Sequence, residues 1–163
     1  PMQHLTPATA PRYGFDFCND RADRSQPYRD ARRFTDDAIR FALRHEAKTV
    51  ALVPCCQAEV AACLRQTKAL TLSRTPLAEL WRHPLHTREF GSQITNVLRC
   101  LYLEARGYQV TVTELVGWEH SLKNELILAR YTGQPKHSAA TRLQALLTQF
   151  GLESLIGVRF KLS

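Results

Sequence analysis

The sequence lacks several features that would assign it at once to a class of protein. It has no window of about 18 uncharged apolar residues, so we expect no transmembrane helix and no membrane partner. It also lacks a Cys-x-x-Cys pair, and its five cysteines are unevenly spaced, with only Cys55 and Cys56 adjacent. This pattern excludes a disulfide framework and a structural zinc site of the usual spacing. We therefore expect reduced thiols and a cytoplasmic location.

A tract of positive charge is missing as well. The 22 Lys and Arg residues outnumber the 15 Asp and Glu residues, which gives a formal net charge of +7. The excess is divided as +2, +3 and +2 over residues 1–45, 46–100 and 101–163, so no segment concentrates it. Charge therefore favours a nucleic-acid partner only weakly.

The length of 163 residues fits one domain with a hydrophobic core. Residues 1–33 differ from the rest, because they hold four of the eight prolines and many Arg and Asp residues with little periodicity. We expect them to be an atypical, irregular segment, in which residues 13–17 are the one candidate strand. Residues 34–163 have regular patterns and are expected to form the folded unit.

The most informative short stretch is the apolar run of residues 50–53, which ends at Pro54 and two adjacent cysteines. Four apolar residues in succession predict a strand covered on both faces, as in a parallel α/β sheet. In an open sheet of that kind, ligands collect beyond the carboxyl ends of the strands. Pro54, Cys55 and Cys56 would lie at such an edge.

The remaining periodicity predicts the other elements. Helices are expected at 35–46, 57–66, 76–81 (short), from before residue 94 up to Gly107, and at 139–150. Strands are expected at 49–53, 108–116 and 125–131, the last two joined by the turn-like residues 117–123. The resulting order is α/β with an antiparallel pair near the end.

Three phrases in this order resemble a family. They are "TDDAI" at 35–39, "VPCC" at 53–56 and "EHSLKN" at 119–124. Together they are similar to a branch of the class I S-adenosylmethionine-dependent methyltransferases. In that branch a Thr-Asp-x-Ala-like helix precedes a strand ending in Pro-Cys-Cys, and the last hairpin carries Glu-His-x-x-x-Asn. The resemblance covers roughly residues 34–132 and implies the C-terminal half of a Rossmann-like sheet, with an antiparallel seventh strand between the fifth and the sixth.

The resemblance also shows what the sequence does not contain. Family members hold the cofactor with a glycine-rich turn after the first strand, whereas the seven glycines here never fall two residues apart. We therefore expect the first three or four strands to be missing from this polypeptide. Two explanations compete: the chain is a fragment, or residues 1–33 come from a shifted reading frame. S-adenosyl-L-methionine as cofactor is implied by the resemblance alone.

The same resemblance gathers candidate site residues at one edge. If the seventh strand pairs beside the fifth, Asn124 lies near Pro54, and the turn with His120 stands over Cys55 and Cys56. His120 would be a general base, and Cys56 a thiolate aided by the helix that follows. Pro54, Cys55, Gln57 and Asn124 would contact the acceptor, with Gln57 and Asn124 as hydrogen-bonding groups.

Simpler interpretations stand beside these roles. The histidine is then a turn residue bonded to backbone, Asn124 caps the strand, and Pro54 only ends its pairing. Either cysteine is then a small buried thiol, and metal ligation is a further alternative. Asp36 and Asp37 are interpreted as helix-start charges.

Other polar residues weigh less. His83 and His86 have a spacing compatible with a metal pair, but no acidic or thiol partner lies near them in sequence, and no metal is expected. Arg82, Arg88 and Arg99 could meet phosphate, but we interpret them as residues of solvated helix faces.

The resemblance therefore implies a methyltransferase-like half-fold that acts on a nucleic acid, such as RNA, or on a protein, with little or no catalysis by the isolated chain. The alternative is a non-catalytic RNA- or protein-binding module built on the same half-fold. In either case the strand at 49–53 would present an open edge, at which we expect a homodimer unless the segment 13–17 covers it.

Overall fold

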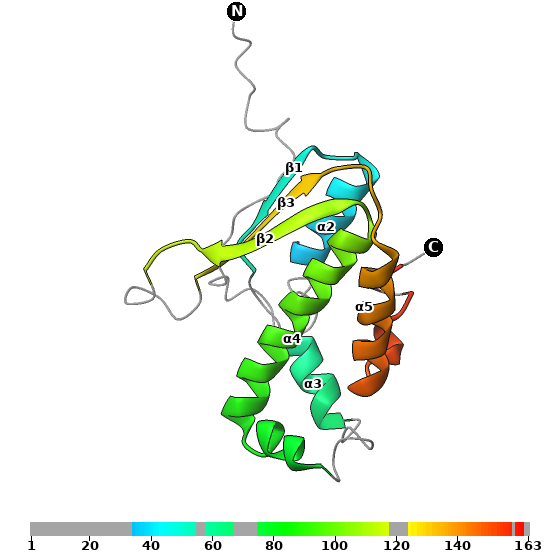
Figure 1. Cartoon of the computed structure of the whole chain (residues 1–163). Coiled ribbons are helices and arrows are strands. Elements are labelled where there is room, and N and C mark those ends of the chain that lie inside the picture. Colours follow the sequence, from blue (N-terminus) through cyan, green and yellow to red (C-terminus); the bar gives the residue numbers. More distant parts are fainter. Residues whose placement is uncertain (1–33, 55–57, 67–74, 118–123, 158, 162–163) are drawn as a thin grey trace, which may run out of the picture.

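The structure is a computed structural model. It describes five stretches of the chain, namely residues 34–54, 58–66, 75–117, 124–157 and 159–161. Within them the elements follow the order expected from the sequence, with a mixed α/β architecture (Figure 1). The expectations for residues 1–33, including the strand at 13–17, lie outside the described residues.

The helices begin and end where the local chemistry favours it. They are α2 (Phe34–Arg44), α3 (Ala58–Gln66), α4 (Pro84–Ala105) and α5 (His137–Gln149), with short 3-10 helices η2 (Pro76–Trp81) and η3 (Glu153–Leu155). Acidic residues occupy the first turn of α2 and Arg44 its last turn, as the helix dipole favours. Pro76 and Pro84 stand at initial helical positions, where a missing N–H costs nothing. No helix in these stretches is both long and apolar enough to cross a membrane.

The sheet has three strands among the described residues, β1 (Thr49–Leu52), β2 (Tyr108–Glu114) and β3 (Glu125–Tyr131). Their order is β1-β3-β2, and β3 runs antiparallel to both neighbours. β1 and β2 therefore point in the same direction without touching. The expected antiparallel hairpin of β2 and β3 is confirmed, with Val110 opposite Ala129 in its register.

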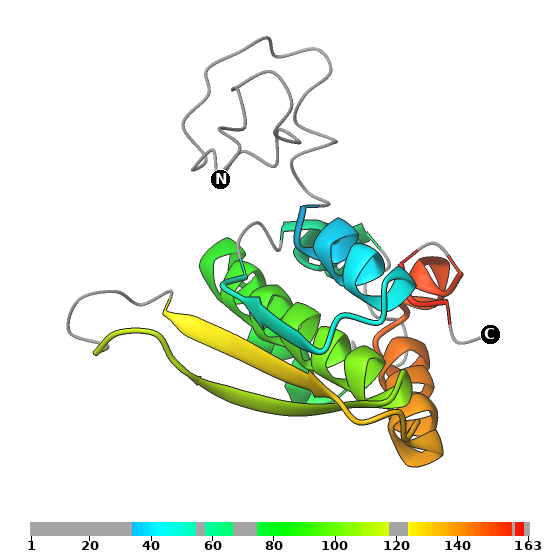
Figure 2. The ribbon, with the colours of Figure 1, turned by 90° about the horizontal axis from the view of Figure 1, so that it is seen from above.

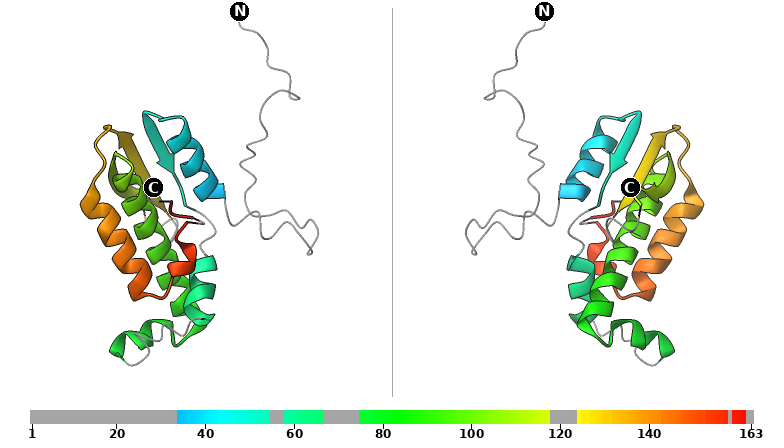
Figure 3. Two further views of the ribbon diagram at one scale, coloured as in Figure 1. Left: turned by 90° about the vertical axis from the view of Figure 1, so that its right-hand side faces the viewer. Right: turned by 90° about the vertical axis from the view of Figure 1, so that its left-hand side faces the viewer.

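The expectation that both faces of β1 are covered is wrong. Val50 and Leu52 are buried, whereas Thr49 and Ala51 are exposed, so burial alternates along the strand. The helices gather on one side of the sheet (Figures 1 and 3). Val50, Leu52, Ile127 and Ala129 face them, whereas the opposite face of β1 is exposed.

Helix α4 is the centre of the core. It packs against α3, α5, η2 and β2, and its buried residues lie on several sides, from Ile94 to Leu103. Gly91 permits the closest approach, since a Cβ there would lie 2.7 Å from both the Cβ and the backbone nitrogen of Ala61 in α3. The helix ends before Gly107, whose φ of +91° is the left-handed conformation expected at a helix C′ position.

The start of β2 fastens α2 to the sheet. The hydroxyl of buried Tyr108 lies 3.3 Å from the carbonyl oxygen of Ala42 and 3.0 Å from that of Ala47. Burial raises the pKa of Tyr108, and the nearby Tyr131 and Glu46 add to the effect. The neutral phenol, which can donate to these carbonyls, is therefore the favoured form.

The end of the chain returns to α4 and α2. The apolar stripe expected in the last helix is confirmed, because Leu143, Leu147 and Phe150 are buried and Leu146 packs against the core. After η3, the ring of Phe160 stacks edge-on against Tyr102, with centroids 5.6 Å apart. This contact carries Arg159 to the first turn of α2.

Candidate functional site at the carboxyl edge of the sheet

The sheet brings two of the predicted site residues to the same end. Leu52 pairs with Ile127, so the register carried two residues further places Pro54 opposite Glu125, next to Asn124. Pro54 is half-buried there. Cys55, Cys56, Gln57 and His120 lie outside the described residues, and their expected roles stay predictions.

Asn124 makes its contacts within the hairpin. Its carbonyl oxygen accepts a hydrogen bond from the N–H of Leu115 at 2.7 Å. Its side-chain amide donates to the carbonyl oxygen of Val116 at 2.5 Å. The amide therefore closes the end of the β2–β3 hairpin, and its oxygen Oδ1 is the group left to meet a ligand.

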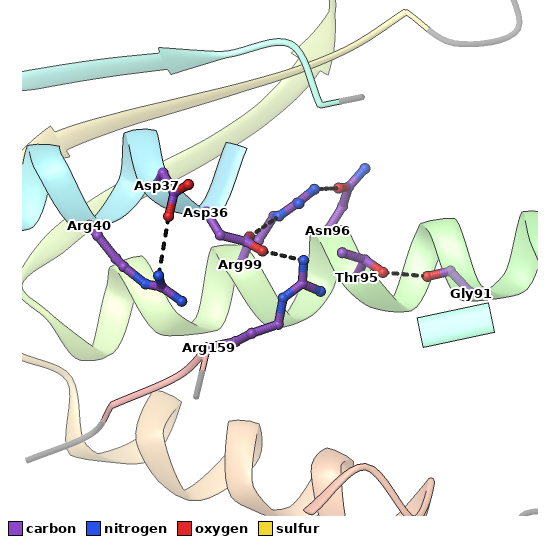
Figure 4. A network of polar contacts seen from close by, with 8 residues as sticks. All are labelled: Asp36, Asp37, Arg40, Gly91, Thr95, Asn96, Arg99 and Arg159. Carbon is purple, nitrogen blue, oxygen red and sulfur yellow. Dashed lines mark hydrogen bonds and ion pairs between the residues drawn. The ribbon is translucent and has the colours of Figure 1, made fainter. Parts of the chain in front are cut away.

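A buried group of charged side chains lies beside this edge. Asp36, in the first turn of α2, accepts a hydrogen bond at Oδ1 from Nε of Arg99 in α4 at 2.8 Å. Its second oxygen forms an ion pair with Arg159 from the C-terminal segment. The side chains of Arg99 and Arg159 are 0% and 4% exposed, so these three elements share one desolvated contact (Figure 4).

The polar contacts continue to the first residue of β3. Nη1 of Arg99 donates to Oδ1 of Asn96 at 3.1 Å, and Nδ2 of Asn96 donates to Oε2 of Glu125 at 2.5 Å. We call Asp36, Asn96, Arg99, Glu125 and Arg159 the edge cluster. Its chain of contacts links the C-terminal segment, α2, α4 and the strand end that carries Asn124.

The charges of the edge cluster balance, because two guanidinium groups accompany two carboxylates. Such balance is needed, since a buried charge without a partner costs several kcal/mol, on the order of 3–5 when one member of a pair is removed. Nη2 of Arg99 is the one buried donor of the edge cluster without a hydrogen-bond partner among the described residues. The edge cluster is suited to hold Glu125 and the adjacent Asn124 in place rather than to move protons.

Sequence reasoning missed this cluster. Arg99 was expected on a solvated face, and the structure contradicts this because the side chain is fully buried. A signal was present: Arg99 follows Thr95 by four residues and precedes Tyr102 by three, so it shares their buried stripe. Its partner Asp36 is 63 residues away, which no local pattern connects.

The other arginines behave as expected. Arg82 pairs with Glu79 and Arg88 with Glu89, and all four side chains are more than half exposed. These are helix-surface ion pairs, worth about 0–1 kcal/mol each.

His83 and His86, the pair with metal-compatible spacing, are exposed, and their rings meet edge to face with centroids 5.4 Å apart. Within the described stretches no group of three or more potential metal ligands is found.

Cys100 follows Arg99 and is half-buried. Burial raises its pKa to about 12, and the carboxylates of Glu125 and Glu104 add to the effect, while Arg99 opposes it. Its thiol is therefore protonated at neutral pH and is a poor nucleophile.

Comparison with family models, with curated proteins and with solved structures finds no match for this chain. The assignment of function therefore depends on the residues and their geometry.

Proposed function

We propose that the described residues form the acceptor-side part of a class I S-adenosylmethionine-dependent methyltransferase-like protein. The observation that carries this proposal is the strand order β1-β3-β2, with β3 antiparallel to both neighbours. The family resemblance implies this same order for the fifth, seventh and sixth strands. A unit that paired its strands in chain order would place β2, not β3, beside β1.

In this proposal the carboxyl edge of the sheet receives the methyl acceptor. Methyl transfer requires alignment of the acceptor and, for a weak nucleophile, removal of its proton. Asn124 and Pro54 share this edge by register, and Asn96 holds Glu125 beside them. His120 would remove the proton, and Cys55, Cys56 and Gln57 would line the approach of the acceptor, which is RNA or protein.

The described residues do not fit the cofactor that the resemblance implies. None of their glycines lie two apart, so they supply no glycine-rich turn to approach it closely. The buried carboxylate of Asp36 is also engaged by two arginines, which leaves it unable to receive a ribose hydroxyl. We therefore propose that this chain by itself does not hold S-adenosylmethionine.

Calorimetric titration of the full chain with S-adenosylmethionine tests this proposal. We expect no saturable heat at micromolar cofactor. Saturable binding would show that the chain holds its own cofactor and would overturn the proposed half-site.

A second titration separates acceptor binding from a general RNA-binding module. RNA binding without cofactor binding, with an affinity that falls steeply as salt rises, would favour the module.

A further inference from the structure

Strand β1 pairs with a described strand on only one of its two sides. The carbonyl oxygen of Lys48 accepts a hydrogen bond from the N–H of Tyr131 at 2.9 Å, and Val50 pairs with Ala129 in the same register. Alternate residues of an antiparallel strand turn their backbone groups to opposite sides. The N–H and C=O groups of Thr49, Ala51 and Val53 therefore point away from β3. We call these six groups the free edge of β1, because no other described strand pairs with it.

Within the described residues, the short length of β1, four residues, is the one usual protection against pairing that the free edge has. Natural edge strands are protected by short length, by charged side chains or proline on the edge, by inward charges or by a covering element. Pro54 lies an even number of residues after Val50, so its backbone faces β3, as that of Val50 does. The N–H that proline lacks is therefore absent from the β3 side, and the free edge loses no donor. The three residues of the free edge are uncharged, and Val53 is 50% exposed.

Helix α2 lies beyond β1 on the side away from β3 (Figures 2 and 3). Its surface there follows from the helical turn of 100° per residue. The side at Asp36 faces Arg99 of α4, and the side at Ala42 meets Tyr108 of the sheet. Continuing past Ala42, the next side of the helix carries Ala38 and Phe41, both exposed.

Beyond this apolar flank the surface of α2 becomes polar, because Asp37, one turn before Phe41, forms an exposed ion pair with Arg40. Phe41 is 51% exposed, and its ring lies 4.4 Å from that of His45, centroid to centroid. An apolar flank next to the free edge provides a surface on which a further strand can pack, as helices cover the faces of sheets.

The amino-terminal end of the free edge is basic. Arg44 and Lys48 are exposed, and neither forms an ion pair with the described residues. Glu46 is the one acidic residue between them. An acidic group at the matching end of an added strand would be attracted there.

We propose that the free edge of β1 and the apolar flank of α2 form a docking slot for an extended strand of another polypeptide. The incoming strand is apolar at alternate positions, which face α2, and acidic at the end that lies beside Lys48. Its backbone pairs with the N–H and C=O groups of the free edge, and its side chains supply specificity, as in other cases of β-strand addition.

A second copy of this chain fits the slot poorly. Antiparallel pairing of β1 with its own copy would relate the two molecules by a two-fold axis and place both α2 helices under the same pair of strands. Neighbouring strands lie about 4.8 Å apart, whereas packed helices need about 8–10 Å between their axes. The expected homodimer is therefore an alternative outcome of the test below.

The test uses fluorescein-labelled seven-residue peptides and the full chain. Two of the peptides alternate Val and Thr. One of them carries two Glu residues at its N-terminus and the other carries them at its C-terminus, so that either strand direction is tested. Two matched peptides carry Lys in place of Glu. Fluorescence anisotropy is expected to show saturable binding of one acidic peptide and weaker binding of both basic peptides.

Substitution of Ala51 by proline isolates the free edge. The N–H of Ala51 points away from β3, so Ala51→Pro removes a donor from the free edge and none from the β1–β3 ladder. Peptide binding should weaken about tenfold or more, the effect of losing one or two hydrogen bonds. Val112→Pro makes the same change at the outer edge of β2 and should leave binding unchanged.

Reversal of charge provides the second variant. Lys48→Glu should exchange the preference, so that the basic peptide binds more tightly than the acidic one. Circular dichroism should show that the Ala51→Pro and Lys48→Glu variants are both folded. The proposal is overturned if no acidic peptide binds, if Ala51→Pro binds as well as the parent, or if sedimentation shows a dimer that Ala51→Pro dissociates.

Discussion

The edge cluster and the free edge of β1 differ in whether their polar groups have partners. In the edge cluster, four charged side chains are drawn from distant parts of the chain, and the guanidinium of Arg99 is fully buried. At the free edge, the polar groups belong to the backbone of uncharged residues and have no strand partner among the described residues. The charged groups, which are costly to bury without a partner, are paired in the edge cluster, whereas the backbone groups of the free edge pair with no described strand.

Helix α2 connects the two regions. Asp36 fixes its first turn to α4 and to the C-terminal segment, while Phe41 lies exposed on its apolar flank. One side of the helix is thus held by buried ion pairs, whereas the ring of Phe41 on another side is 51% exposed. The comparison predicts large stability effects at the edge cluster and small ones at the free edge.

The largest effect is expected for Asp36→Ala. The change removes the one carboxylate that Arg99 and Arg159 both bind. Removing one member of a buried pair costs about 3–5 kcal/mol in the free energy of unfolding. Urea denaturation followed by circular dichroism measures it.

Asp37→Ala is the matched control. Asp37 belongs to the same helical turn, but its pair with Arg40 is exposed and should be worth less than about 1 kcal/mol. Equal losses for the two variants would contradict the distinction between the buried cluster and the surface.

A smaller effect is expected where α3 crosses α4, next to the edge cluster. In Gly91→Ala, the new Cβ would lie 2.7 Å from the backbone nitrogen of Ala61, which cannot move as a side chain can. Overpacking of this kind costs about 1–3 kcal/mol. Thermal unfolding should show the loss, whereas Ser92→Ala, at the next position of α4, should show none. A Gly91→Ala variant as stable as the parent would mean that α3 and α4 separate easily.

The order of the elements could be predicted from the sequence because each has a strong local signal. Gly107 ends α4 with a positive φ, and the alternation in β2 and β3 predicts a hairpin. The coverage of β1 could not be predicted in this way. Ala51 and Val53 are apolar, yet a run of apolar residues does not show which face the helices cover.

The candidate site was predicted less well, since its strongest contacts join residues far apart in sequence. The meeting of Pro54 and Asn124 at one edge followed from the family resemblance, not from periodicity. Arg99 lies in a helical stripe with Tyr102, which indicates burial, but its pairing with Asp36 depends on how α2 crosses α4. Arg159 reaches the same carboxylate only because the chain turns back after α5.

A still smaller effect is expected at Asn124, a half-buried residue whose amide nitrogen donates one hydrogen bond. Asn124→Ala removes the hydrogen bond to Val116 and should lower the free energy of unfolding by about 0.5–1.5 kcal/mol. Asn124→Asp keeps the size but replaces the donor by an acceptor, so an equal or larger loss is expected in urea denaturation. A neutral Asp variant would show that the donor at this position contributes nothing.

The smallest effect at neutral pH concerns Cys100, which should not react at all on the timescale of exposed thiols. Its pKa of about 12, against 9.0 for a free thiol, leaves roughly a thousandfold less thiolate below pH 9. Iodoacetamide labelling, read by mass spectrometry of the peptide that contains Cys100, should be correspondingly slow in the folded chain and fast in urea. Because burial raises this pKa, the stability contributed by the neutral thiol is complete below pH 9 and is lost as the pH rises towards 12. Rapid labelling at pH 8 in the folded chain would mean that water reaches α4 beside Arg99, and the edge cluster would then be no drier than the free edge of β1.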